Sequence, residues 1–165
     1  MSFGEAIKSV FSKYATFSGR ARRSEFWYFY LFNLLVTVGL NIVTKFVPSI
    51  KYLSLIYSLG ILVPNLAVSV RRLHDIGKRG LTLLWFLVPS FIIVMLLTLM
   101  VTVFTTHNSE SGSSTFIILY LVFAFILLAL SILFIVWMAR DSQPGENQWG
   151  PNPKEMPGNE PQNLD

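Results

Sequence analysis

The chain has 165 residues, a length that is typical of one domain. Hydrophobic residues make up 53% of it and charged residues only 13%, whereas soluble domains carry about 25% charged residues, so we expect lipid to be its main solvent. It contains no cysteine, which excludes disulfides and thiolate metal sites, and its formal net charge of +4 is modest.

Residues 1–18 are predicted to form an amphipathic helix on the membrane surface. Phe3, Ile7 and Val10 recur at helical spacing, and polar residues occupy the opposite face. Ser2 and Glu5 fit a capping box at the start of this helix. The order of residues differs from the basic, apolar and small-residue order of a cleavable signal peptide. A helix that packs on its own bundle fits the same pattern, and both alternatives stay open.

Four segments, at about residues 26–46, 52–70, 81–104 and 116–139, are almost free of charge and long enough to cross a bilayer. Each must be a helix, because lipid offers no hydrogen-bond partner to free backbone groups. The predicted fold is an all-α integral membrane protein, a four-transmembrane-helix bundle that occupies residues 19–140. Its Lys and Arg residues gather in residues 1–25, 71–79 and 140–154, which places both termini in the cytoplasm.

Polar residues on the first two membrane helices predict that these helices face each other. The candidates are Asn33 and Asn41 on the first helix and Asn65 on the second. Such side chains ordinarily form hydrogen bonds between packed helices. The alternative is a small transporter or channel that uses this polar stripe. Pro64 removes one backbone amide, so the carbonyl of Gly60 is expected to lose its partner within the helix.

Arginines cluster just before the first of these two helices and just after the second. Both clusters are predicted to lie at the cytoplasmic interface. Arginine holds phosphate or carboxylate through two parallel hydrogen bonds, which setting the topology alone would not require. Our leading hypothesis is a non-enzymatic protein that binds an anionic phospholipid headgroup or a partner protein, another copy of itself included. The candidate anion-binding residues are Arg20, Arg22, Arg23, Arg71 and Arg72, with Glu25, His74 and Asp75 as ion-pair or orienting partners.

Catalysis is a further alternative, because His74 and Asp75 are adjacent and could act as acid and base on a lipid. A zinc site would need three or four ligands, and the second histidine, His107, is predicted to lie on the other side of the membrane. No nucleotide-binding or acyl-nucleophile motif is present in the chain. We therefore expect no catalytic residue, metal or cofactor, and no nucleic-acid partner.

The last 25 residues, 141–165, contain five prolines, three glycines and four asparagines. Such a segment buries too little apolar surface to order itself, so a flexible cytoplasmic tail is predicted. Trp149 is expected to anchor the early part of this tail on the membrane surface.

Three stretches resemble a known family. They are GRARRSEFWYF at residues 19–29, the stretch from Pro64 to Gly80 that contains VRRLHDIGKRG, and GENQWGPNP at residues 145–153. Together they are similar to the bacterial inner-membrane family called domain of unknown function 805. The resemblance implies a small integral protein of the bacterial cytoplasmic membrane, and it implies no particular activity, substrate or catalytic residue.

Overall fold

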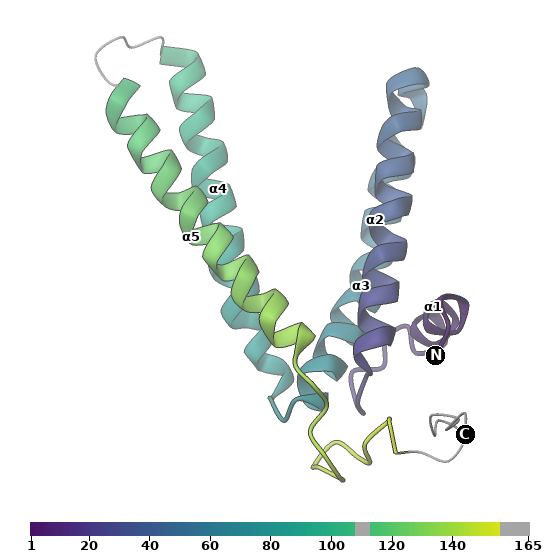
Figure 1. The fold of residues 1–165 in the computed structure, drawn as a ribbon. Helices are drawn as coiled ribbons and strands as arrows, with labels where there is room; N and C mark the ends of the chain where they lie inside the picture. Colours follow the sequence, from purple (N-terminus) through teal and green to yellow (C-terminus); the bar gives the residue numbers. More distant parts are fainter. Residues whose placement is uncertain (108–112, 156–165) are drawn as a thin grey trace, which may run out of the picture. The chain divides into compact units, whose positions relative to one another are not determined.

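The computed structural model describes residues 1–107 and 113–155. Within them the chain forms five α-helices and two short 3₁₀ helices, and no β-strand (Figure 1). The elements are α1 (Phe3–Ser12), α2 (Arg23–Phe46), η1 (Pro48–Ile50), α3 (Lys51–Asp75), η2 (Gly80–Leu83), α4 (Leu84–His107) and α5 (Ser113–Ala139). The prediction of an all-α fold is confirmed.

Helices α2 to α5 are each long and apolar enough to cross a membrane, as the four predicted segments required. The protein is therefore an all-α membrane protein. Each of these helices extends past its predicted segment at one end or both, and two of the extensions involve charged residues: α2 begins at Arg23 rather than at residue 26, and α3 continues to Asp75 rather than ending at residue 70. Arg23 and Glu25 consequently lie on the first turn of α2, and Arg71, Arg72, His74 and Asp75 lie on the last turns of α3, whereas Arg20 and Arg22 precede α2.

Contacts divide the chain into two compact units. The first unit combines Met1–Gly80 with Met138–Asp165, and the second is Leu81–Trp137. The segments 1–18, 19–140 and 141–165 suggested by the sequence stay a prediction, and residues 140–155 belong to the same compact unit as Met1–Gly80. In the second unit, α4 and α5 meet through the rings of Phe86 and Phe134, 5.4 Å apart between centroids.

Helix α1 is both amphipathic and packed on its own unit. Ser2 and Glu5 form the predicted capping box, in which each side chain bonds the other residue's backbone amide. Ala6 and Val10 are fully buried, and the ring of Phe11 lies edge-on to Phe29 of α2. Figure 1 shows α1 almost end-on beside α2, so that the two helices cross. The alternative of packing on the bundle therefore holds in this structure.

The carbonyl of Gly60 finds a partner outside its own helix. Pro64 lies inside α3 and has no amide to offer this carbonyl. The hydroxyl of Tyr14, just after α1, donates a hydrogen bond to it instead. The break in the hydrogen-bond ladder of α3 is thus closed by the N-terminal segment.

Candidate functional site

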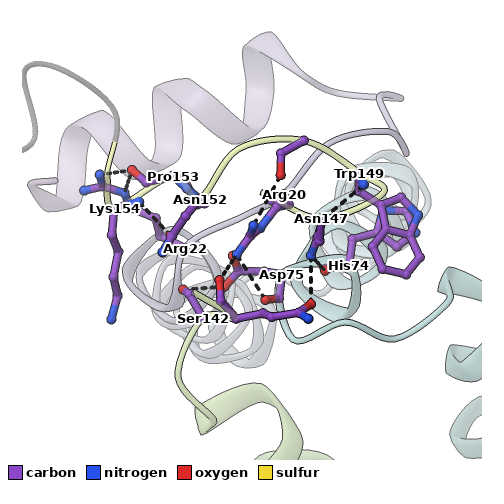
Figure 2. Close-up of polar contacts among 12 residues, drawn as sticks. Arg20, Arg22, His74, Asp75, Ser142, Asn147, Trp149, Asn152, Pro153 and Lys154 are labelled. Carbon is purple, nitrogen blue, oxygen red and sulfur yellow. Dashed lines mark hydrogen bonds and ion pairs between the residues drawn. The ribbon is translucent and has the colours of Figure 1, made fainter. Parts of the chain in front are cut away.

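Polar side chains gather in the first unit where α2 begins, α3 ends and the chain leaves α5 (Figure 2). We call residues 142–153, which run across this cluster, the strap. We call the whole cluster the polar knot; it consists of the strap together with Arg20, Arg22, Arg23, Glu25, Arg71, Arg72, His74 and Asp75.

Asp75, the last residue of α3, is the centre of the polar knot. Its side chain is fully buried. Oδ1 accepts a hydrogen bond from Nε of Arg20 at 3.0 Å, and Oδ2 accepts hydrogen bonds from Arg72 and, at 2.6 Å, from the hydroxyl of Ser142. One carboxylate therefore serves two buried guanidinium groups, and a buried charge of this kind requires such pairing.

Arg20 joins the strap to α3 with all three nitrogens of its guanidinium group. Nη1 donates to the carbonyls of Gly145, at 2.8 Å, and Gly150, at 3.3 Å. Nη2 donates to the carbonyl of Gln143 and to that of Asp75. With Nε on the Asp75 carboxylate, these contacts engage the five N–H groups that an arginine carries. Arg20 therefore has no donor left for a ligand.

Two arginines cap the C-terminal end of α5. Arg72 donates from Nε to the carbonyl of Met138 at 3.0 Å and from Nη2 to that of Arg140, and Arg23 donates to that of Ala139. The last carbonyls of a helix lack partners within it and carry the negative end of its dipole. These two side chains supply both hydrogen bonds and positive charge at that end.

Arg71 and Glu25 form a second buried ion pair, with 3.0 Å between Nη1 and Oε1. The hydroxyl of Ser9 on α1 donates to the same carboxylate oxygen at 3.2 Å. Nε and Nη2 of Arg71 are buried and have no hydrogen-bond partner in the structure. Arg71 is thus the least satisfied charged group of the polar knot, because each unpaired buried donor costs about 1–3 kcal/mol.

His74 is held between the segment before α2 and the strap. Its Nδ1 lies 3.1 Å from the carbonyl oxygen of Gly19, and its ring stacks on that of Trp149 with 4.5 Å between centroids (Figure 2). The side-chain Nδ2 of Asn147 donates a hydrogen bond to the backbone carbonyl of His74 at 3.0 Å. Trp149 therefore packs on the protein itself, where the sequence suggested an anchor on the membrane.

The strap also differs from the predicted flexible tail, for the part of the tail that the structure describes. The backbone amide of Gln143 donates to the carbonyl of Asp75 at 2.8 Å, and Arg22 donates to the carbonyl of Pro153. These hydrogen bonds to the rest of the unit hold the strap in place, which its small apolar surface could not do. The remainder of the predicted tail, residues 156–165, lies outside the described residues.

The candidate anion-binding arginines are placed differently from the expectation that they face headgroups. Arg20, Arg71 and Arg72 are buried, because the carboxylates and helix-end carbonyls beside them need these donors. Arg22 is half-buried on the strap, and Arg23 pairs with Asp141 at 3.4 Å near the surface. Lys154 bonds the same carboxylate and lowers the pKa of Asp141.

The polar stripe brings together two of its three asparagines. Nδ2 of Asn33 donates to Oδ1 of Asn65 at 3.1 Å, and the hydroxyl of Tyr57 donates to Oδ1 of Asn33 at 2.6 Å. Asn41 is exposed on α2 and bonds only the carbonyl of Thr37, one turn earlier. Asn33 and Asn65 therefore link α2 and α3 through a hydrogen bond.

Ser142, Gln143 and Asn147 are members of the polar knot that the sequence did not single out. Asn147 lies in the third family-like stretch, at residues 145–153, which resembled the family without revealing what it contacts, whereas Ser142 and Gln143 precede that stretch and carried no signal. Within residues 1–107 and 113–155, no group of three His, Cys, Asp or Glu side chains is placed to hold a metal ion.

Comparison with known families agrees with this architecture. Residues 14–151 match the family described as "Protein of unknown function (DUF805)". The chain belongs to this family. It is 38% identical over 106 residues to inner membrane protein YhaI of Escherichia coli K12, which covers 64% of this chain and 90% of that protein. It is 29% identical over 155 residues to inner membrane protein YhaH of the same strain, which covers 90% of this chain and 95% of that protein. No solved structure matches the chain.

Proposed function

We propose that this member of the family is a non-enzymatic protein of the bacterial inner membrane that binds anionic lipid headgroups at its cytoplasmic face. One observation carries this proposal: beside the polar knot, four exposed cations form no ion pair with any described residue. They are Lys8, Lys13, Arg79 and Arg140. The buried arginines hold the fold, and these outer cations are left to meet the bilayer surface.

The distribution of charge supports the orientation. Eleven of the thirteen Lys and Arg residues lie on the side of α2 and α3 that carries the polar knot, whereas Lys45 and Lys51 lie at the opposite ends of these helices. Cytoplasmic segments of bacterial membrane proteins carry such an excess of Lys and Arg. Anionic lipids attract basic residues next to the membrane by about 1 kcal/mol each.

The contacts of His74 and Asp75 weigh against an enzyme, and those of the polar stripe weigh against a transporter or channel. Both carboxylate oxygens of Asp75 accept hydrogen bonds from buried partners, which disfavours this group as an acid or base, and the ring of His74 is buried against Trp149, which disfavours its contact with a lipid. Asn33 and Asn65 bond each other, which favours helix packing over a polar path for transport.

The proposal is tested by the lipid that the purified full-length chain retains. We expect the protein in nanodiscs of mixed phosphatidylglycerol and phosphatidylcholine to enrich phosphatidylglycerol, as measured by native mass spectrometry. The variant Arg79→Gln/Arg140→Gln should lower this preference by about 2 kcal/mol, or roughly thirtyfold. The control variant Lys45→Gln/Lys51→Gln removes the same amount of charge at the opposite ends of α2 and α3 and should retain the preference for phosphatidylglycerol. Equal retention of the two lipids by the unmodified protein would refute headgroup binding.

A further inference from the structure

The first unit contains a hollow of about 250 Å³ beside the polar knot. The segment that follows α1 forms one side of it through Lys13, Thr16 and Ser18. The strap forms the other side through Trp149, Pro151 and Pro153. The hollow thus has a polar wall and a largely apolar wall, which is the usual composition of a small-molecule site.

The polar wall offers donors and positive charge. Lys13 is exposed and forms no ion pair with any described residue. Arg20 also borders the hollow, but its five donors are already engaged, so Lys13 provides the accessible cation there. No carboxylate lines the hollow. An anion therefore meets an ammonium group and two hydroxyls, whereas a cationic ligand would find no opposite charge there.

The apolar wall is held in place independently of any ligand. The indole of Trp149 is stacked on His74, and the carbonyl of Pro153 accepts hydrogen bonds from Arg22. The rings of Pro151 and Pro153 also limit the backbone freedom of this wall. A wall that is ordered before binding loses little entropy when a ligand arrives.

We propose that this hollow binds a phosphate group, with Lys13, Thr16 and Ser18 as its donors and the strap as its apolar wall. Ammonium and hydroxyl groups make charge-assisted hydrogen bonds to phosphate oxygens. The site lies beside the amphipathic helix α1, on the face that we propose to be cytoplasmic, where phospholipid headgroups would offer this chemistry. This assignment rests on the proposed function and gives it a location; free phosphate would offer the same oxygens.

Lys8 provides a matched control for Lys13. Both lysines are exposed, belong to the same N-terminal segment and form no ion pair with the described residues, but only Lys13 lines the hollow. The cap that Lys13 makes on α1 uses its backbone amide, so a change of side chain leaves that cap in place. Thr16→Val/Ser18→Ala removes both hydroxyls without changing the net charge.

The experiment titrates the detergent-purified full-length protein with phosphatidylglycerol and, separately, with inorganic phosphate, and reads bound adducts by native mass spectrometry. We expect one saturable adduct, weakened about fivefold in Lys13→Gln and clearly less in Lys8→Gln, which removes an exposed cation that does not line the hollow. Thr16→Val/Ser18→Ala should weaken it by a similar factor. Saturation by the lipid alone would identify a headgroup site, and saturation by inorganic phosphate as well would identify a site for free phosphate groups.

The hollow and the broader proposal fail in different ways. If phosphatidylglycerol binds in preference to phosphatidylcholine but Lys13→Gln and Lys8→Gln weaken it equally, headgroup binding stands and the hollow is not the site. If the unmodified protein binds neither lipid preferentially and also no inorganic phosphate, both proposals fall. A loss in Lys13→Gln without any loss in Thr16→Val/Ser18→Ala would leave only a general charge effect and would also overturn the site.

Discussion

The two units of the protein are stabilised by opposite means. The first unit holds three ion pairs whose side chains are at most 4% exposed, and a strap that is bonded mainly through backbone carbonyls. In the second unit, helices α4 and α5 contain no Asp, Glu, Lys or Arg and meet through aromatic rings. Lipid is as apolar as the side chains of α4 and α5, so burial of apolar surface drives their association weakly. The first unit therefore depends on specific polar partners, and removal of one partner should lower its free energy of unfolding by a large amount.

Removal of the Asp75 carboxylate should test this dependence most severely. Asp75→Ala leaves the buried guanidinium groups of Arg20 and Arg72 without a counter-charge, and we expect a loss of about 3–5 kcal/mol in the free energy of unfolding. Asp141→Ala removes an exposed carboxylate that also has two cationic partners, and should lose less than about 1 kcal/mol. Denaturant unfolding in detergent, followed by tryptophan fluorescence, measures both. Similar losses in the two variants would contradict a special role for buried charge.

The Arg71–Glu25 pair gives a sharper version of the same comparison. Glu25→Leu isolates a buried guanidinium group that already has unpaired donors, so a loss of about 3–5 kcal/mol is expected. The double variant Arg71→Met/Glu25→Leu removes both charges and should recover most of that loss, because well-packed apolar residues often replace a buried ion pair at little cost. A double variant as unstable as the single one would mean that the pair contributes through more than its charges. The same unfolding measurement applies.

Truncation separates the strap from the residues after it. A chain that ends at residue 141 loses every hydrogen bond of the strap, but the cut also admits water to Arg20, so a loss smaller than that of Asp75→Ala is expected, about 2–3 kcal/mol. A chain that ends at residue 155 keeps the whole strap and should unfold like the full-length protein. Stability of the shorter chain equal to that of the longer one would show that the strap is dispensable.

Asn33 and Asn41 compare a position bonded across the helix pair with one bonded only within its own helix. Asn33→Leu breaks the hydrogen bonds to Asn65 and Tyr57 and should lose about 1–2 kcal/mol. Asn41→Leu should lose nothing, because its amide bonds only its own helix. The variants Asn33→Cys and Asn41→Cys test the transport alternative, since the chain has no native cysteine. Rapid labelling of the Asn33→Cys variant by a water-soluble thiol reagent would indicate a polar path and contradict the packing role.

Tyr14 should give the smallest effect. Tyr14→Phe removes the hydrogen bond to the Gly60 carbonyl and should cost about 0.5–1.5 kcal/mol. In the Pro64→Ala background an amide is restored within α3, so the same change should then cost almost nothing. Thermal unfolding of the four proteins completes the cycle. Equal losses in both backgrounds would mean that Tyr14 acts by packing and not through that carbonyl.

The sequence predicted the features that depend on residues close together in the chain. Hydrophobic length predicted the four membrane helices, and Ser2 and Glu5 predicted the start of α1. The released carbonyl of Gly60 was foreseen from Pro64, but the distant Tyr14 that bonds it was not. The arginine clusters were visible in the sequence, but their partners are mostly backbone carbonyls at residues 138–153, which no side-chain pattern reveals. For that reason charges that looked available for a ligand turned out to be buried.

The position of the strap in the chain sets the order in which the polar knot can form. Arg20, Arg72 and Asp75 are made before α4 and α5, whereas Ser142 and Gln143 follow α5. Ser142 follows Asp75 by 67 positions, which at a synthesis rate of about 5–20 residues per second is a delay of several seconds. During that interval the carbonyls after residue 137 that accept hydrogen bonds from Arg20 and Arg72 have not yet been made. The strap is therefore the last part of the polar knot to be synthesised, and the polar knot can be completed only after α4 and α5 have been made.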